Sequence, residues 1–168
     1  MEVKIKKLVP YAIIPTYAKE GDAAMDVTAI SINITEDYVE YDTGLAFEVP
    51  ENYVMLIFPR SSNSKQDLVL ANSVGVLDSG YRGSLKLRYK RQYRVRNINN
   101  DGITLLQTTN VAFGRNIESY IFDANKIYEV GDKVGQIMII PRPKINFKEV
   151  DELTETERGD GGFGSTGK

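Results

Sequence analysis

Short segments that favour β-structure follow one another along the whole chain. Segments rich in β-branched and aromatic residues cover 3–9, 31–34, 38–49, 53–58, 67–71, 84–89, 103–109, 126–130, 133–140 and 147–150. Turn-forming residues separate them, for example at 99–102 and 131–132. No segment shows a sustained helical period, residues 61–65 suffice for one short turn, and 117–124 is ambiguous. The pattern predicts an all-β fold, either a barrel or a jelly-roll-like sandwich.

The composition excludes several kinds of catalytic site. The 168 residues contain neither cysteine nor histidine, so disulfides, thiolate or histidine metal sites and Ser-His-Asp chemistry are ruled out. Any catalysis must therefore use carboxylates, hydroxyls, lysine, arginine, backbone dipoles, or a metal held by oxygen atoms. Mg²⁺ fits that set of ligands.

Length, composition and charge predict a single soluble globular domain. With 42% hydrophobic and 26% charged residues the chain is an ordinary globular protein, and 168 residues can bury a core. The net charge of −2 gives no general attraction to nucleic acid or to anionic membranes. No stretch approaches the length of a membrane span and the N-terminus lacks a signal-peptide pattern, so we expect a cytoplasmic protein with no membrane partner.

The glycine-rich stretch RGDGGFGSTGK, residues 158–168, has the composition of a nucleotide-binding segment. Its glycines, Gly164 among them, let backbone N–H groups approach a ligand closely. Arg158, Ser165 and Thr166 offer donors to phosphate oxygens, and Phe163 offers a face for stacking on a base. A P-loop is excluded, because the Ser/Thr and the helix that should follow Lys168 are missing. A flexible linker is the remaining alternative, which this stretch alone does not exclude.

A second candidate site lies in NSVGVLDSGYRG, residues 72–83. Asp78 stands between apolar strand residues and a Ser-Gly turn, and an apolar hairpin around a carboxylate makes it a better base. Tyr81 follows within the turn. The alternatives are that Asp78 caps the turn and that Tyr81 is a cross-strand packing residue.

Further polar residues stand at the ends of apolar segments. Arg60, Ser61 and Ser62 follow a strand and suit phosphate binding, although an N-cap after a strand explains them as well. Asp26 lies in a short apolar segment, where an ion or its bound water would explain the charge. Gln136 enters the apolar segment 137–140 and needs a hydrogen-bond partner.

Two segments are distinguished by their charge. Cations at 86, 88, 90, 91, 94 and 96 favour a solvated edge strand over a nucleic-acid patch. Acidic residues at 149, 151, 152, 155 and 157 are typical of a solvated leash before the glycine-rich stretch.

In order along the chain stand DAAMDVTA (22–29), PRSSNS (59–64), NSVGVLDSGYRG (72–83), GDKVGQ (131–136) and RGDGGFGSTG (158–167). This series closely resembles the five ordered motifs of the trimeric deoxyuridine triphosphatases (dUTPases). The resemblance implies a homotrimer of jelly-roll-like subunits with shared active sites. It also implies Mg²⁺-dependent hydrolysis of dUTP to dUMP and pyrophosphate, which limits uracil in DNA and supplies dUMP for thymidylate synthesis.

The resemblance also implies a role for each matching residue. Asp78 would activate the water that attacks the α-phosphorus, and Tyr81 would pack under the deoxyribose and exclude a 2′-hydroxyl. The segment containing Asn72, Val76 and Leu77 would read uracil. The remaining roles are phosphate binding by Arg60, Ser61, Ser62, Gln136, Arg158, Ser165 and Thr166, stacking on uracil by Phe163, and water-mediated contact of Asp26 with Mg²⁺.

The sequence departs from the family pattern in a few places. Asn63 stands where an apolar residue is common, and Gly135 replaces a usual alanine. Residues 90–125 form an insertion that resembles those of some phage dUTPases, which suggests a regulatory protein partner and, for a phage enzyme, the host cytoplasm. We expect one β domain over 1–150 and a lid over 151–168. The alternatives are a dCTP deaminase of the same fold, alone or bifunctional, and a regulatory binding protein.

Overall fold

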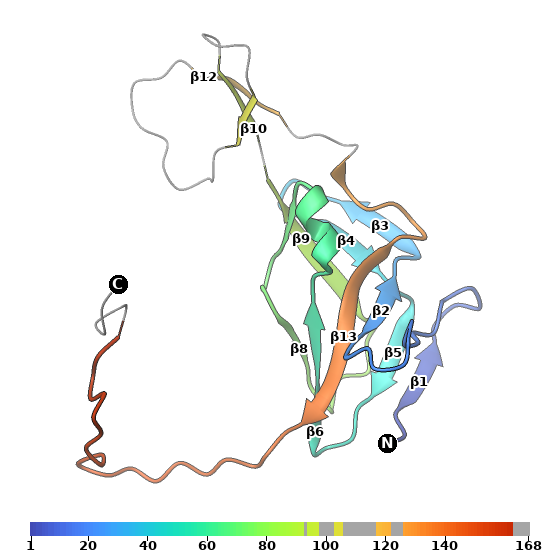
Figure 1. The fold of residues 1–168 in the computed structure, drawn as a ribbon. Helices are drawn as coiled ribbons and strands as arrows, with labels where there is room; N and C mark the ends of the chain where they lie inside the picture. The colour runs from blue at the N-terminus through green and yellow to red at the C-terminus, as the bar shows by residue number, and fades with distance from the viewer. Residues whose placement is uncertain (93, 98–102, 106–116, 122–125, 163–168) are drawn as a thin grey trace.

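The structure, a computed structural model, describes residues 1–92, 94–97, 103–105, 117–121 and 126–162 (Figure 1). Its strands are β1 (Lys4–Lys7), β2 (Met25–Thr28), β3 (Ser31–Ile34), β4 (Val39–Asp42), β5 (Leu45–Glu48), β6 (Tyr53–Phe58), β7 (Leu68–Leu70), β8 (Gly75–Leu77), β9 (Lys86–Arg91), β10 (Arg94–Asn97), β11 (Ile103–Leu105), β12 (Ile117–Ile121) and β13 (Lys133–Pro141). The short turn expected at 61–65 is a 3-10 helix, η1 (Ser61–Lys65). The all-β class is confirmed.

Two four-stranded antiparallel sheets build the body of the molecule. One has the strand order β2-β13-β6-β8 and the other β3-β4-β9-β7, while β1 pairs with β5. Met55 and Ile137 of the first sheet and Tyr41 and Leu87 of the second belong to one buried cluster. The two sheets therefore share a core, as in a jelly-roll-like sandwich.

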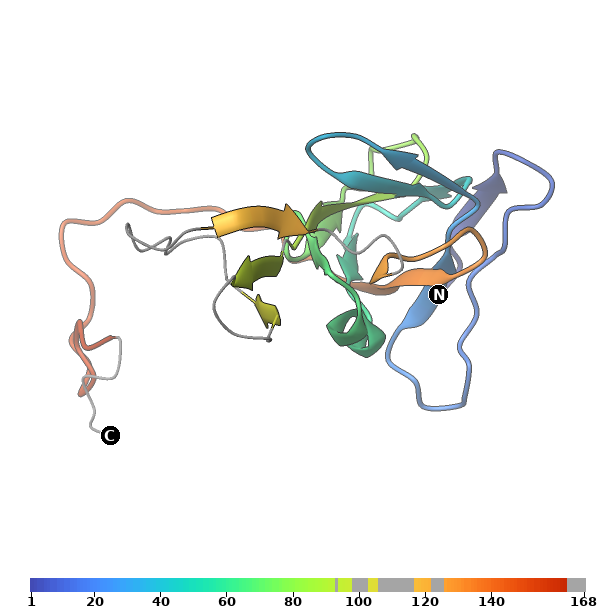
Figure 2. The same cartoon turned by 90° about the horizontal axis from the view of Figure 1, so that it is seen from above.

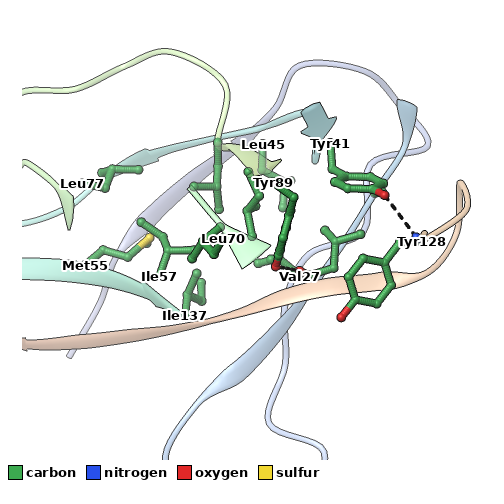
Figure 3. Packing of buried hydrophobic residues seen from close by; sticks show 14 of the residues in the cluster. Val27, Tyr41, Leu45, Met55, Ile57, Leu70, Leu77, Tyr89, Tyr128 and Ile137 are labelled. Carbon is green, nitrogen blue, oxygen red and sulfur yellow. Dashed lines mark hydrogen bonds between the residues drawn. The ribbon is translucent and has the colours of Figure 1, made fainter. Parts of the chain in front are cut away.

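Three tyrosines fill one end of this core (Figure 3). The rings of Tyr41, Tyr89 and Tyr128 pack edge to face with centroids 5.8 to 6.0 Å apart. Each hydroxyl has a partner: Tyr41 accepts from the Tyr128 backbone N–H at 3.1 Å, and Tyr89 donates to the Val134 carbonyl at 2.5 Å. Tyrosine hydroxyls are protonated at neutral pH, and burial raises the pKa of all three still further.

The expected edge strand at 84–89 is instead an inner strand. β9 alternates exposed and buried residues as predicted, but it lies between β4 and β7. Two of its outward cations are paired across the sheet, since Lys86 Nζ lies 3.0 Å and Arg88 Nε 2.7 Å from the carboxylate of Glu40 on β4. The Arg88 guanidinium also lies 4.4 Å from the ring centre of Tyr38. Charge on this strand reflects cross-strand pairing, not protection of an edge.

The predicted strand 38–49 is broken by a corner at Thr43–Gly44. Gly44 has a φ of 63°, and a Cβ there would come within 2.4 Å of Ile30 Cδ1. The Asp42 carboxylate accepts the Gly44 N–H at 2.7 Å, and the buried Thr43 hydroxyl donates to the Leu85 carbonyl at 2.8 Å. The strand tendency of the flanking residues therefore continues in β4 and β5, which belong to different sheets.

Two other predicted strands are wrong. Residues 126–130 precede β13 without forming a strand, and their apolar character reflects the buried Tyr128. Residues 147–150 are extended but unpaired in the sheets described, and Phe147 is 95% exposed. Conversely, β2 was not predicted as a strand, because Asp26 interrupts its apolar pattern. Part of the predicted strand 103–109 lies outside the described residues, which include only β11 from it.

Two parts of the chain stand apart from the body. The sheet β11-β10-β12 falls within the expected insertion, and after β13 the chain runs away from both large sheets (Figures 1 and 2). The proposed division into residues 1–150 and 151–168 remains a prediction. Within the described residues, no helix combines the length and the apolar character needed to cross a membrane.

Candidate functional site

Half of the residues of the third motif line one cavity. A space of about 500 Å³ is bordered by Asn72, Val76, Leu77, Asp78 and Tyr81. β8 brings them there through its pairing with β6, in which Leu77 lies opposite Met55 and Gly75 opposite Ile57. A side chain on Gly75 would approach Ile57 Cβ to 3.1 Å, so glycine lets β8 pack closely at this point. We call this cavity the nucleoside pocket, after the role that the resemblance to dUTPases implies for these residues.

Tyr81 is held at the rim of the nucleoside pocket by its own loop. Its backbone N–H donates to the Asp78 carbonyl at 3.1 Å, and its hydroxyl donates to the Ser84 carbonyl at 3.1 Å. The ring lies over Gly83, where a Cβ would come within 2.4 Å of the tyrosine oxygen. Arg82 closes the turn by donating to the carbonyls of Ser79 and Tyr81 at 2.5 and 2.9 Å. The turn therefore presents Asp78 and Tyr81 together.

The surroundings of Asp78 differ from the expected apolar hairpin. Asp78 is exposed, and Val76 beside it is 62% exposed. A single chain therefore leaves this carboxylate open to water. Glu40 also borders the nucleoside pocket, but it is buried and both of its oxygens pair with cations. Of the two carboxylates that border the nucleoside pocket, Asp78 is therefore the exposed one.

A second cluster joins residues of the first, second and fourth motifs. Arg60 Nε lies 2.7 Å from Asp26 Oδ1, and Lys133 Nζ lies 3.0 Å from Asp26 Oδ2. Arg60 also donates to the Ser62 hydroxyl at 3.3 Å, and Gln136 donates to the Pro59 carbonyl at 3.0 Å. We call these residues the cation cluster.

Strand register creates the cation cluster. On β13, Gln136 lies opposite Asp26 of β2 and also opposite Phe58 of β6. Arg60 follows Phe58 by two residues, which brings its guanidinium over the same row. Gly135 allows close packing here, because a Cβ would meet Leu87 Cδ2 at 2.4 Å and the Phe58 carbonyl at 3.2 Å. The departure from alanine at this position is thus explained by Leu87.

Electrostatics keep Asp26 ionised. Burial acts to raise the pKa of its carboxyl, but hydrogen bonds and charge from Lys133 and Arg60 outweigh burial and lower that pKa. A cavity of about 600 Å³ next to it is bordered by Asp22, Asp26 and Gln136, all of which carry oxygen donors. Both Asp26 oxygens already pair with cations, so this group suits Mg²⁺ through bound water better than direct ligation. Among the described residues no group of three or more acidic side chains could hold a metal by itself.

The two sets of residues do not meet within one chain. The nucleoside pocket lies beside β8, at one edge of its sheet, and the cation cluster spans β2 and β13 towards the other edge. In the part of the chain that the structure describes, no residue borders both the nucleoside pocket and the cavity beside Asp26. Ser61 is exposed within η1.

The tail residues complete the account of the predicted site. Arg158 is exposed and donates to the Gly161 carbonyl at 3.0 Å. Phe163, Gly164, Ser165 and Thr166 lie outside the described residues, so their roles remain predictions. Sequence reasoning did not single out Lys133, because residues three apart on a regular strand face opposite sides of the sheet. The pairing of β13 with β2 is irregular between Lys133 and Gly135, and no local pattern reveals this.

Comparison with known proteins agrees with this geometry. The dUTPase family model matches residues 10–112. A deoxyuridine 5′-triphosphate nucleotidohydrolase of Nautilia profundicola is 34% identical, with all of both chains covered, and that of Escherichia phage T5 is 34% identical over 98% of each. The structure resembles Staphylococcus bacteriophage 80alpha dUTPase with dUpNHpp, with a TM-score of 0.71, 27% identity and 99% of both chains covered. This chain belongs to the dUTPase family.

Proposed function

We propose that this dUTP diphosphatase cleaves the bond between the α- and β-phosphates of dUTP by attack of a water molecule that Asp78 deprotonates. The observation that carries this proposal is the shared turn of Asp78 and Tyr81 at the rim of the nucleoside pocket. The water oxygen bonds to the α-phosphorus, its proton passes to Asp78, and pyrophosphate leaves, so that dUMP and pyrophosphate are the products. Phosphoryl transfer of this kind needs positioning and charge stabilisation without a covalent nucleophile.

The other residues bind and orient the nucleotide. Asn72, Val76 and Leu77 border the space for the base, and Tyr81 fills the position where a 2′-hydroxyl would lie. Arg60, Ser61, Ser62 and Gln136 hold phosphate oxygens, and Arg158, Phe163, Ser165 and Thr166 close over the bound nucleotide. Bound Mg²⁺ would neutralise phosphate charge, and Asp26 and Asp22, which border one cavity, would supply oxygen atoms to hold it or its bound water.

Activity against a panel of nucleotides tests this proposal. Purified protein with Mg²⁺ is expected to release pyrophosphate from dUTP and to act far more slowly on UTP, dCTP and dTTP. Tyr81 should exclude the 2′-hydroxyl of UTP, and the space for the base should exclude the 5-methyl group of dTTP. Chelation of Mg²⁺ should remove most of the activity. A chain that left dUTP intact would contradict the proposal, and ammonia release from dCTP would identify the deaminase alternative.

We also propose that the protein is a homotrimer whose active sites combine residues of different subunits. The separation of the nucleoside pocket from the cation cluster within one chain supports this arrangement. Exposed apolar residues, among them Val74 and Val76 beside the nucleoside pocket, offer surface for a neighbouring subunit.

Light scattering at the working concentration is expected to give three times the 18.8 kDa mass of the chain. Mixing two inactive variants, one in Asp78 and one in Arg60, should restore part of the activity, because some sites then combine two intact halves. A monomer that is fully active would contradict shared sites. A regulatory partner at residues 90–125 remains a further hypothesis, because most of that segment lies outside the described residues.

A further inference from the structure

The 3-10 turn η1, which carries residues proposed to bind phosphate, has few stabilising contacts of its own. η1 spans only Ser61–Lys65, buries none of its residues, and lacks a side-chain cap at Arg60. Its internal bonds are the Asn63 N–H to the Arg60 carbonyl at 2.9 Å and the Ser64 hydroxyl to the Ser61 carbonyl at 2.9 Å. A single 3-10 turn of this kind is marginal without outside contacts.

Asn63 supplies those outside contacts from the middle of the turn. Its Nδ2 donates to the Leu68 carbonyl at 2.9 Å, and its Oδ1 accepts from the Tyr128 hydroxyl at 3.2 Å. The Asn63 carbonyl also accepts the Gln66 N–H at 3.0 Å. One polar side chain therefore ties η1 both to β7 and to the segment before β13. An apolar side chain at position 63 could make neither bond.

Tyr128 is itself fixed by the core. It is 3% exposed, its ring packs against Tyr41 and Tyr89, and its backbone N–H donates to the Tyr41 hydroxyl. Figure 3 shows the Tyr128 hydroxyl pointing away from Tyr41. That hydroxyl donates to Asn63 Oδ1 at 3.2 Å. Because a tyrosine hydroxyl is protonated at neutral pH and burial raises this pKa further, the bond is kept across the neutral pH range.

We propose that Tyr128 and Asn63 are positioning residues for the triphosphate: their hydrogen bond fixes η1 against the tyrosine core and so places Arg60 and Ser62. This inference rests on the proposed function of the cation cluster. Arg60 is joined to Asn63 by the backbone bond within the turn, and to Ser62 through its own guanidinium. A turn that shifts by a fraction of an ångström would weaken several phosphate contacts together.

The bond between Tyr128 and Asn63 also lies close in the chain to the points where the sheet β11-β10-β12 is attached to the body. The Asp67 N–H donates to the Lys126 carbonyl at 2.9 Å, and the Gln92 N–H donates to the Asp67 carbonyl at 2.8 Å. The chain therefore leaves and rejoins the body on either side of Asp67, directly after η1. Tyr128 lies two residues beyond Lys126, so the segment that returns from this sheet also contains the hydroxyl that donates to Asn63.

Tyr128→Phe tests the proposal because it removes one hydroxyl and keeps the packed ring. The affinity for dUpNHpp is expected to fall by about five- to tenfold, as for loss of one hydrogen bond, while the affinity for deoxyuridine stays unchanged. KM for dUTP should rise more than kcat falls. Asn63→Leu should show the same pattern with a larger loss, because it also removes the bond to the Leu68 carbonyl. Combining the two substitutions should add little to Asn63→Leu, because both remove the bond between Tyr128 and Asn63.

Thr43→Val is the matched control. It also removes one buried hydroxyl bond, but the accepting Leu85 carbonyl keeps the Thr43 N–H at 3.1 Å. Its thermal midpoint should fall about as much as that of Tyr128→Phe, with the ratio of dUpNHpp to deoxyuridine affinity unchanged. If Tyr128→Phe left the ratio of dUpNHpp affinity to deoxyuridine affinity unchanged, the positioning role would be overturned. A wild-type protein that binds no dUpNHpp would instead overturn the proposed function.

Discussion

Asp78→Asn is expected to lower kcat for dUTP by about 10²–10⁴-fold, the usual contribution of a general base. Asparagine has nearly the same shape as aspartate but cannot accept a proton from the attacking water. Because Asp78 is exposed at the end of β8, the substitution leaves no buried group unpaired and should not alter the thermal midpoint. The affinity for dUpNHpp, measured by titration calorimetry, should change little. Binding without turnover is therefore the expected combination.

Asp37→Asn is the control for this experiment. Asp37 is also exposed, but it lies in the connection between β3 and β4 and borders neither the nucleoside pocket nor the cavity beside Asp26. It should keep the wild-type kcat. If Asp78→Asn kept it as well, another group would have to activate the water.

Local patterns predicted the strands well where burial alternates along one sheet. β9 is the clearest case, with Leu87 and Tyr89 buried and Lys86 and Arg88 outside. The same rule failed at 38–49, because the break there depends on Gly44 packing under Ile30, a contact between separate segments. It also failed at 126–130, where a single buried aromatic, Tyr128, produced a strand-like pattern without a strand partner.

The sequence offered individual candidate residues for the site, but it did not reveal how they are arranged. The resemblance to dUTPases named Asp26, Arg60 and Gln136 individually. Their meeting depends on the register of β13 against both β2 and β6, which no local pattern contains. The ion pair of Lys133 with Asp26 and the bond between Tyr128 and Asn63 depend on the same long-range packing. The departure at Asn63 was visible in the sequence, and the bonds of its side chain to the Leu68 carbonyl and the Tyr128 hydroxyl explain it.

Truncation after Glu157 is expected to leave a folded protein of unchanged oligomeric state that turns over dUTP at least about 10²-fold more slowly. The buried core ends within β13, at Ile137, so the removed residues contribute nothing to it. In the described tail the hydrogen bonds are local, joining Thr156 to Gly159 and Arg158 to Gly161. The lost groups are the proposed closure of the nucleotide, Arg158 and residues 163–166. Affinity for dUpNHpp should therefore fall steeply, while affinity for deoxyuridine should fall only by the loss of stacking on Phe163.

Two point variants separate the binding of phosphate from the stacking on the base. Arg158→Lys keeps the charge but not the planar pair of donors, so it should weaken dUpNHpp binding and leave deoxyuridine binding intact. Phe163→Leu should weaken both ligands, because stacking acts on the base. Light scattering and thermal melting check that all three variants keep the assembly and the fold. A truncated protein with wild-type kcat/KM would show that the glycine-rich segment takes no part in catalysis, and the nucleoside pocket and cation cluster alone would then have to account for turnover.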